Sequence, residues 1–155
     1  MRKETQAIYT AYQNHGAMAT GKREIFRNDE PFQTDSARVS MGCFPTGCTK
    51  SVSFFRPEEA LVTESVGIGL SLDLPPGTYP IEPGNNNAFA YYAFDRKVPG
   101  DGGWWSTPYY PYEGSIKLDA YDQDTLSMSG EFTFRVKVEH LIQTFRGSFD
   151  LKERR

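Results

Sequence analysis

The sequence has few of the residues that build catalytic and metal sites. Its 155 residues include only two cysteines, Cys43 and Cys48, and only two histidines, His15 and His140. Neither histidine lies near a serine, cysteine or aspartate in a recognisable nucleophile motif. The four residues between the cysteines match neither a redox pair nor half of a zinc site. We therefore expect no catalytic residues, no cofactor and no enzyme activity.

Long apolar runs are also absent. No stretch approaches the roughly 20 apolar residues of a membrane-spanning helix, and no signal-type apolar block follows the charged start at 1–6. We expect a soluble protein without a membrane span. Its compartment stays open: cytoplasmic as the sequence stands, or periplasmic or envelope-associated if an export signal has been removed.

The chain has no excess of positive charge. Lysine and arginine number 17 against 20 aspartate and glutamate residues, which gives a formal net charge of −3. Such a chain has no long-range attraction for phosphate backbones. We therefore expect no nucleic-acid partner.

What the chain does have is a strict alternation of apolar and polar residues. Between 114 and 138, on both sides of a polar turn at 122–125, the alternating positions hold Ile116, Leu118, Ala120, Leu126, Met128, Gly130, Phe132, Phe134, Val136 and Val138. A period of two places one face of a strand in a core and the other in water. The segment predicts a β-hairpin with Phe132, Phe134 and Val136 in the core.

Similar patterns predict further strands at 37–43, 49–55, 63–74, 77–81, 88–94 and 141–151. Gly67 and Gly69 predict a close approach of another backbone or a bend, and Pro80 predicts a sheet edge. A short helix is predicted at 3–13, and 17–35 is interpreted as a loop or short edge strand.

Together these patterns predict an all-β fold. We expect an antiparallel β-sandwich or small barrel of about eight strands with a short N-terminal helix. The chain forms a single domain over 1–155, with the helix in 1–16 and the β core in 36–152.

The two cysteines flank a Pro45-Thr46-Gly47 turn, which favours chain reversal and brings the cysteines close together. Two interpretations remain. Cys43 and Cys48 form a local disulfide, which implies an oxidising compartment, or they are two reduced, small hydrophobic residues near a turn.

Aromatic residues gather in a segment rich in glycine and proline. The predicted loop that includes 98–111 carries an aromatic patch from 104 to 112, with Trp104, Trp105, Tyr109, Tyr110 and Tyr112. Rigid rings give large contact area at low entropic cost, so these five are candidate binding residues for a protein, a sugar or a cationic ligand. The alternative is that the rings seal the core at the open end of a sandwich.

Three aspartates near the central turn are weak candidates for a calcium site, because hard cations bind several carboxylate oxygens within one loop. Only Asp122 and Asp124 lie in the turn itself, whereas Asp119 precedes it. The chain has no glycine-containing loop of EF-hand length at this point. We expect solvated turn carboxylates and no metal.

Two motifs resemble those of a known group of proteins. They are Gly77-Thr78-Tyr79-Pro80-Ile81, and Gly114-Ser115-Ile116-Lys117-Leu118 leading through Tyr121-Asp122 to Met128-Ser129-Gly130-Glu131-Phe132-Thr133-Phe134. The pair resembles small uncharacterised bacterial β-proteins, often envelope lipoproteins, with a GtY strand start and a G-x-I-x-I…yD…isGtFsF hairpin. The resemblance covers about half of the chain, from 66 to 149, and implies a β fold rather than an activity. The Asn-Gly-Lys-Pro-Trp-like opening of that group is absent here.

Three functional classes follow. The first is a non-catalytic binding protein that recognises a protein partner through an aromatic and acidic surface, as inhibitors, immunity proteins and accessory factors do. The second is a carbohydrate- or small-ligand-binding module that uses the same aromatic residues. The third is a hydrolase with a carboxylate-based site. A closed pocket lined by Trp104 or Trp105 favours the second class, and a flat aromatic or acidic patch favours the first.

Overall fold

A computed structural model of the chain describes residues 16–45, 47–98, 100 and 103–153. Its elements are β1 (Gly16–Arg27), β2 (Glu30–Pro31), β3 (Ser36–Phe44), β4 (Gly47–Phe55), β5 (Val62–Ser71), β6 (Gly77–Ile81), β7 (Ala88–Lys97), β8 (Trp104–Tyr109), β9 (Glu113–Asp122), β10 (Ser127–Val138) and β11 (Leu141–Glu153). The predicted all-β antiparallel class is confirmed. The helix predicted at 3–13 lies outside the described residues.

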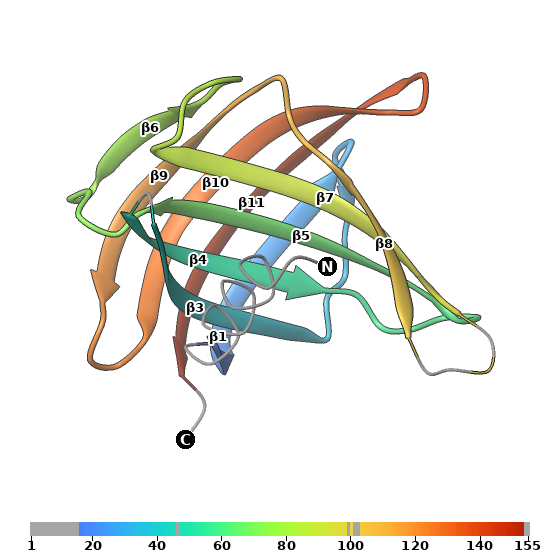
Figure 1. The fold of residues 1–155 in the computed structure, drawn as a ribbon, viewed down its shortest axis with the longest axis horizontal. Coiled ribbons are helices and arrows are strands. Elements are labelled where there is room, and N and C mark those ends of the chain that lie inside the picture. Colours follow the sequence, from blue (N-terminus) through green and yellow to red (C-terminus); the bar gives the residue numbers. More distant parts are fainter. Residues whose placement is uncertain (1–15, 46, 99, 101–102, 154–155) are drawn as a thin grey trace.

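All eleven strands belong to one antiparallel sheet, with the order β6-β9-β10-β11-β1-β3-β4-β5-β7-β8 and β2 paired to β1. The sheet curls so that its two halves face each other (Figure 1). Phe54 of β4 stacks on Phe132 of β10 with ring centroids 6.0 Å apart, although three strands separate β4 from β10 in the sheet. The end strands β6 and β8 are not paired with each other in the described residues. The architecture is therefore a single curled sheet, neither two separate sheets nor a closed barrel.

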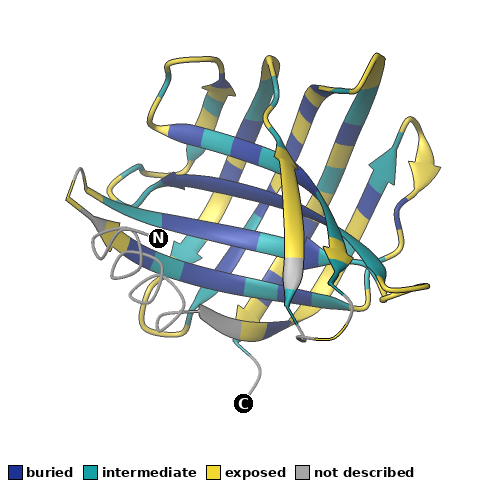
Figure 2. Cartoon of the chain, turned by 45° about the vertical axis from the view of Figure 1, so that its right-hand side comes forward, coloured by how far each residue is buried: buried dark blue, intermediate teal, exposed yellow. Residues whose placement is uncertain are grey.

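The core lies between the two halves of the sheet. Phe132, Phe134 and Val136 are buried, as the alternation predicts, while the residues between them are exposed. Figure 2 shows this as bands of buried and exposed residues along the strands. The rings of Phe134 and Phe145 stack across β10 and β11 with centroids 5.3 Å apart.

The interpretation of 17–35 as a loop or edge strand is wrong. Most of this segment forms β1, which lies inside the sheet between β11 and β3. The β core therefore begins at Gly16 rather than near 36. Its alternation is concealed because Gly21, Arg23 and Arg27 share the core-facing positions with Ala19 and Ile25. Pairing along β11, rather than its own apolar pattern, holds β1 in place.

The room beside Gly67 and Gly69 is used by aromatic rings. A Cβ atom at Gly67 would lie 2.2 Å from the Tyr91 ring, and one at Gly69 would lie 2.0 Å from the Phe89 ring. The Tyr91 and Ser53 hydroxyl oxygens are 2.9 Å apart. The outer-face rings of β7 therefore lie across β5 where it has no side chains.

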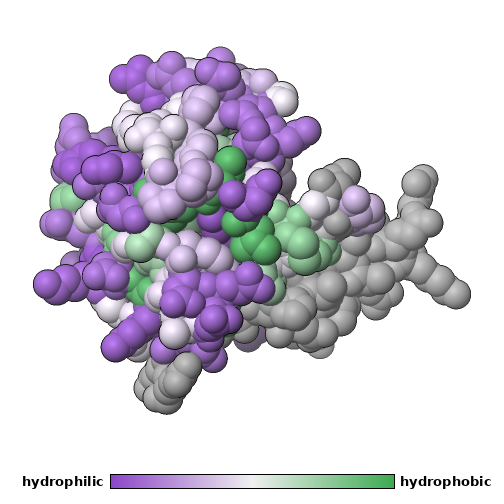
Figure 3. Space-filling view, turned by 90° about the vertical axis from the view of Figure 1, so that its left-hand side faces the viewer, coloured by the Kyte–Doolittle hydropathy of each residue, from purple (hydrophilic) through white to green (hydrophobic). Residues whose placement is uncertain are grey.

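A buried lysine on β4 binds the chain segment that connects β5 to β6. Lys50 is only 2% exposed, and its ammonium donates to the Leu72 carbonyl at 3.0 Å and the Leu74 carbonyl at 2.7 Å. Burial lowers the pKa of Lys50 below its ordinary value, and the Asp73 charge opposes this in part. On the surface of the end of the molecule that carries β6, hydrophilic residues cover most of the described area and hydrophobic ones show only between them (Figure 3).

Candidate functional site

The aromatic segment does not form the loop that its glycines and prolines predict. Residues 104–109 form the edge strand β8, paired only with β7 in the described residues. Tyr109 lies opposite Tyr92, and their rings stack with centroids 6.0 Å apart. One tyrosine of the segment thus packs against the core, as the sealing interpretation expects.

Three other rings of the segment are exposed. Trp105 and Tyr110 are each 72% exposed and Tyr112 is 40% exposed. In Figure 2, β8 crosses the front of the molecule as a mainly exposed strand. The side chain of Trp104 lies outside the described part of the structure. We use the name aromatic face for these three exposed side chains, Trp105 on the edge strand β8 and Tyr110 and Tyr112 in the segment that follows it.

The free edge of β8 is poorly suited to adding another strand. The amide of Val98 donates to the carbonyl of Gly103 at 2.9 Å, which sets the alternation of hydrogen-bonded pairs along β7 and β8. By this alternation the backbone groups of Trp104, Ser106 and Pro108 point away from β7. Pro108 has no N–H to offer a partner strand. Recognition at β8 therefore rests on side chains rather than on extension of the sheet.

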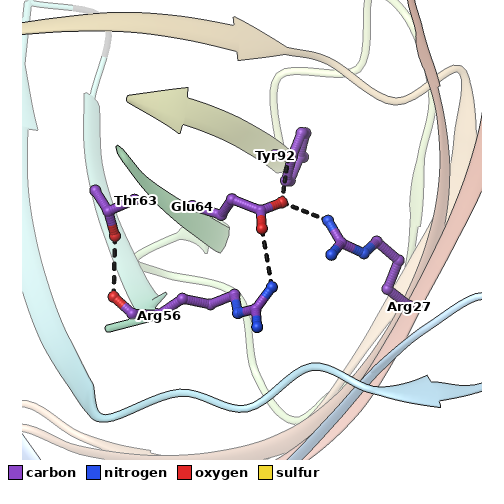
Figure 4. A network of polar contacts seen from close by, with 5 residues as sticks. All are labelled: Arg27, Arg56, Thr63, Glu64 and Tyr92. Carbon is purple, nitrogen blue, oxygen red and sulfur yellow. Dashed lines mark hydrogen bonds and ion pairs between the residues drawn. The ribbon is translucent and has the colours of Figure 1, made fainter. Parts of the chain in front are cut away.

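A polar network lies on the core-facing side of the neighbouring strands (Figure 4). The Glu64 carboxylate accepts hydrogen bonds from Arg27, from Tyr92 and, at 2.9 Å, from Arg56. The two guanidinium groups also lie 5.1 and 5.2 Å from the centroid of the buried Phe32 ring. The network ties β1 and the end of β4 to β5 and β7.

The charges of this network are matched within it. Burial alone would raise the pKa of Glu64, but hydrogen bonds from Tyr92 and Arg27 and the charges of Arg27 and Arg56 outweigh burial, so this pKa is lowered. Burial, with the hydrogen bond and charge of Glu64, raises the pKa of Tyr92 above its ordinary range. Because both Glu64 oxygens are engaged, the network is a structural tie rather than an acid–base pair. Sequence reasoning missed it, although Glu64 falls on the apolar face of the strand with Val66 and Ile68.

The other predicted site residues are distributed over the molecule. Cys43 and Cys48 lie opposite each other across the β3–β4 hairpin and form a disulfide, with Cα atoms 4.0 Å apart. The Asp122 carboxylate accepts from the amides of Asp124 and Thr125 at 2.9 and 3.3 Å, so it closes the β9–β10 turn. No group of three metal-ligating side chains occurs among the described residues. His140 is exposed at a hairpin tip, and His15 lies outside the described residues.

Two hollows lie on the outer face of β1, β11, β10 and β9, and neither is lined by the aromatic face. The described residues contain no helix with the length and hydrophobicity to cross a membrane. Comparisons with protein-family models, curated proteins and solved structures find no match to this chain.

Proposed function

We propose that this protein is a non-catalytic binding protein that recognises a protein partner through the aromatic face. The observation that carries the proposal is the exposure of Trp105 and Tyr110, 72% each, beside a ring that packs into the core. Tryptophan and tyrosine are enriched among residues that dominate binding energy at protein interfaces.

The setting of these rings supports a protein partner. Pairing with β7 and stacking of Tyr109 on Tyr92 hold β8 in place, which lowers the entropic cost of binding. Arg96 lies opposite Trp105, and Glu113, next to Tyr112, pairs with Arg135 at 3.3 Å. Side chains of both positive and negative charge therefore lie near the exposed rings, which matches the polar rim around the apolar centre of a protein interface.

The other two classes have less support. A carbohydrate or small ligand held by the same rings needs a pocket around them, and the two hollows lined by described residues do not include Trp105, Tyr110 or Tyr112. A carboxylate-based hydrolase needs an acid and a base held beside each other. Glu64 is engaged through both oxygens, and the carboxylates of Glu24 and Glu131, unpaired among the described residues, lie on strands separated by β11, with Ser148 between them.

The test is a comparison of captured proteins. Wild-type protein, Trp105→Ala, Tyr110→Ala and the control Met18→Ala are immobilised and exposed to a lysate of the native organism with a cross-linker. Met18 is an exposed hydrophobic residue on β1. We expect one partner to be recovered with wild type and Met18→Ala but depleted with both aromatic variants. Recovery of the same proteins with all four baits would contradict the proposal.

A further inference from the structure

The outer face of the sheet carries a groove that the proposed function does not use. Its two hollows, of about 1090 and 430 Å³, adjoin each other, because both are lined by Glu24, Glu131 and Ser148. Together we call them the outer groove. Residues 31–34 border it beside β1. Both hollows are open to solvent rather than enclosed, and their volumes span the roughly 300–1,000 Å³ of ligand sites in proteins.

The floor of the outer groove consists of short hydroxyl side chains. Ser148 on β11 lies between Glu24 on β1 and Glu131 on β10 in the strand pairing. Ser129 and Thr133 continue this floor along β10. A β-bulge between Ser129 and Gly130 interrupts the pairing with β9, and bulges bend and twist a strand. Small floor residues with longer side chains beside them leave the surface hollow.

The groove has unused hydrogen-bonding capacity. The carboxylates of Glu24, Glu131 and Asp150 make no hydrogen bond or ion pair with other residues in the described part of the chain. Glu24 and Glu131 lie on strands separated by β11, about 9–10 Å apart at the backbone. A ligand above Ser148 can donate to both carboxylates and exchange hydrogen bonds with the hydroxyl group.

The charges along the groove balance. Its lining includes four basic residues, Lys22, Arg23, Lys117 and Arg146, and four acidic ones, Glu24, Asp119, Glu131 and Asp150. The Arg23 side chain contributes only at the border with residues 31–34, where it donates to Thr34. Lys22 lies opposite Asp150, and Lys117 lies opposite Glu131. The carboxylates repel an anionic ligand, and the ammonium and guanidinium groups repel a cationic one. The overall charge of the groove therefore favours the binding of neither.

We infer that the outer groove binds a neutral oligosaccharide. A neutral ligand rich in hydroxyl groups both donates to carboxylates and accepts from lysine and serine, and this is the hydrogen bonding that the groove offers. An apolar ligand would leave these polar groups desolvated and unpaired. The floor strands β10 and β11 are not neighbours of β8 in the sheet, so this inference stands apart from the proposed partner site.

The test begins with labelled full-length protein on an array of neutral, sialylated and sulfated glycans, followed by calorimetric titration of the best neutral glycan. We expect neutral glycans to bind. Ser148→Arg, which places a long side chain on the floor, and Glu131→Gln, which removes one charge without changing shape, should each weaken binding at least about tenfold. Trp105→Ala should leave glycan affinity unchanged.

Three results would overturn the inference: no binding of neutral glycans, binding of charged glycans alone, or glycan affinity that survives both groove substitutions. Thermal melting of each variant controls for folding. If Ser148→Arg fails to fold, Glu131→Gln carries the test, because its side chain is exposed and keeps the wild-type shape. A protein partner lost by Trp105→Ala while the glycan result is negative would leave the proposed function standing and remove only the groove.

Discussion

Gly69 lies directly opposite Phe89 in the pairing of β5 with β7, and the Phe89 ring occupies the place of the side chain that Gly69 lacks. An added Cβ would lie 2.0 Å from this ring, so Gly69→Ala must displace it. We expect Gly69→Ala to lower the free energy of unfolding by about 1–3 kcal/mol. In a Phe89→Ala background the same change should cost little, because alanine is favoured over glycine within a strand. Urea unfolding of the four proteins gives the coupling, and equal costs in both backgrounds would contradict the packing.

Phe134 tests which face of β10 is buried. Its ring stacks on both Phe132 and Phe145 in the core. We expect Phe134→Ala to lower the free energy of unfolding by about 3–5 kcal/mol, whereas Thr133→Ala, on the exposed side, should change it by less than about 0.5 kcal/mol. A small effect of Phe134→Ala with a large effect of Thr133→Ala would place the strand in the opposite register.

The Glu64 network makes stability depend on acidic pH. The pKa of Glu64 is lower in the folded protein than in the unfolded chain, so its contribution is complete above the unfolded value of about 4.3 and is lost as pH falls below it. As pH falls from about 5 to about 3, through the pKa of a glutamate in the unfolded chain, the free energy of unfolding should therefore fall more steeply for wild type than for Glu64→Gln. Glu58→Gln, at an exposed position, is the matched control. A wild-type slope retained in Glu64→Gln would assign the acid dependence to other carboxylates.

The Cys43–Cys48 disulfide closes a short loop at a hairpin tip. Protein purified without reductant and alkylated at once should have a mass about two daltons below that of the dithiol, the two hydrogens lost on forming the bond. Replacing both cysteines by serine should lower the free energy of unfolding by about 2 kcal/mol, because closing a small loop removes little chain entropy. Two alkylated thiols in the unreduced protein would contradict the bond.

Much of the fold is readable from the sequence where a strand has one apolar face. The alternation around Phe132 and Phe134 predicts both the strand and its buried side, and Pro80 correctly indicates an edge strand. Where strand formation depends on distant pairing, local patterns mislead. The segment around Arg23 resembles a loop until β11 pairs with it, and glycine and proline around Trp105 conceal an edge strand that β7 holds.

The candidate sites depend still more on strand pairing. Alternation places Glu64 among apolar neighbours, but its partners Arg27 and Arg56 come from other parts of the chain. Glu24 and Glu131 likewise meet at one groove only because β11 lies between their strands. The glycines and prolines around Trp104 and Trp105 predict that at least one tryptophan is partly exposed, as Trp105 is, whereas its place on the edge strand of the sheet depends on pairing with β7. The side of a strand on which a residue lies is predictable from sequence, whereas its neighbours on other strands are not.

The central claim, that the aromatic face binds a protein partner, is tested most directly by the affinity of Trp105→Ala for the partner recovered with wild-type protein. Trp105 is largely exposed, so its removal should leave the melting temperature nearly unchanged. Calorimetric titration should show a loss of about 2 kcal/mol, roughly 30-fold in Kd. An unchanged Kd, or a loss of binding that accompanies a large drop in melting temperature, would show that Trp105 does not contribute to recognition and would contradict the account.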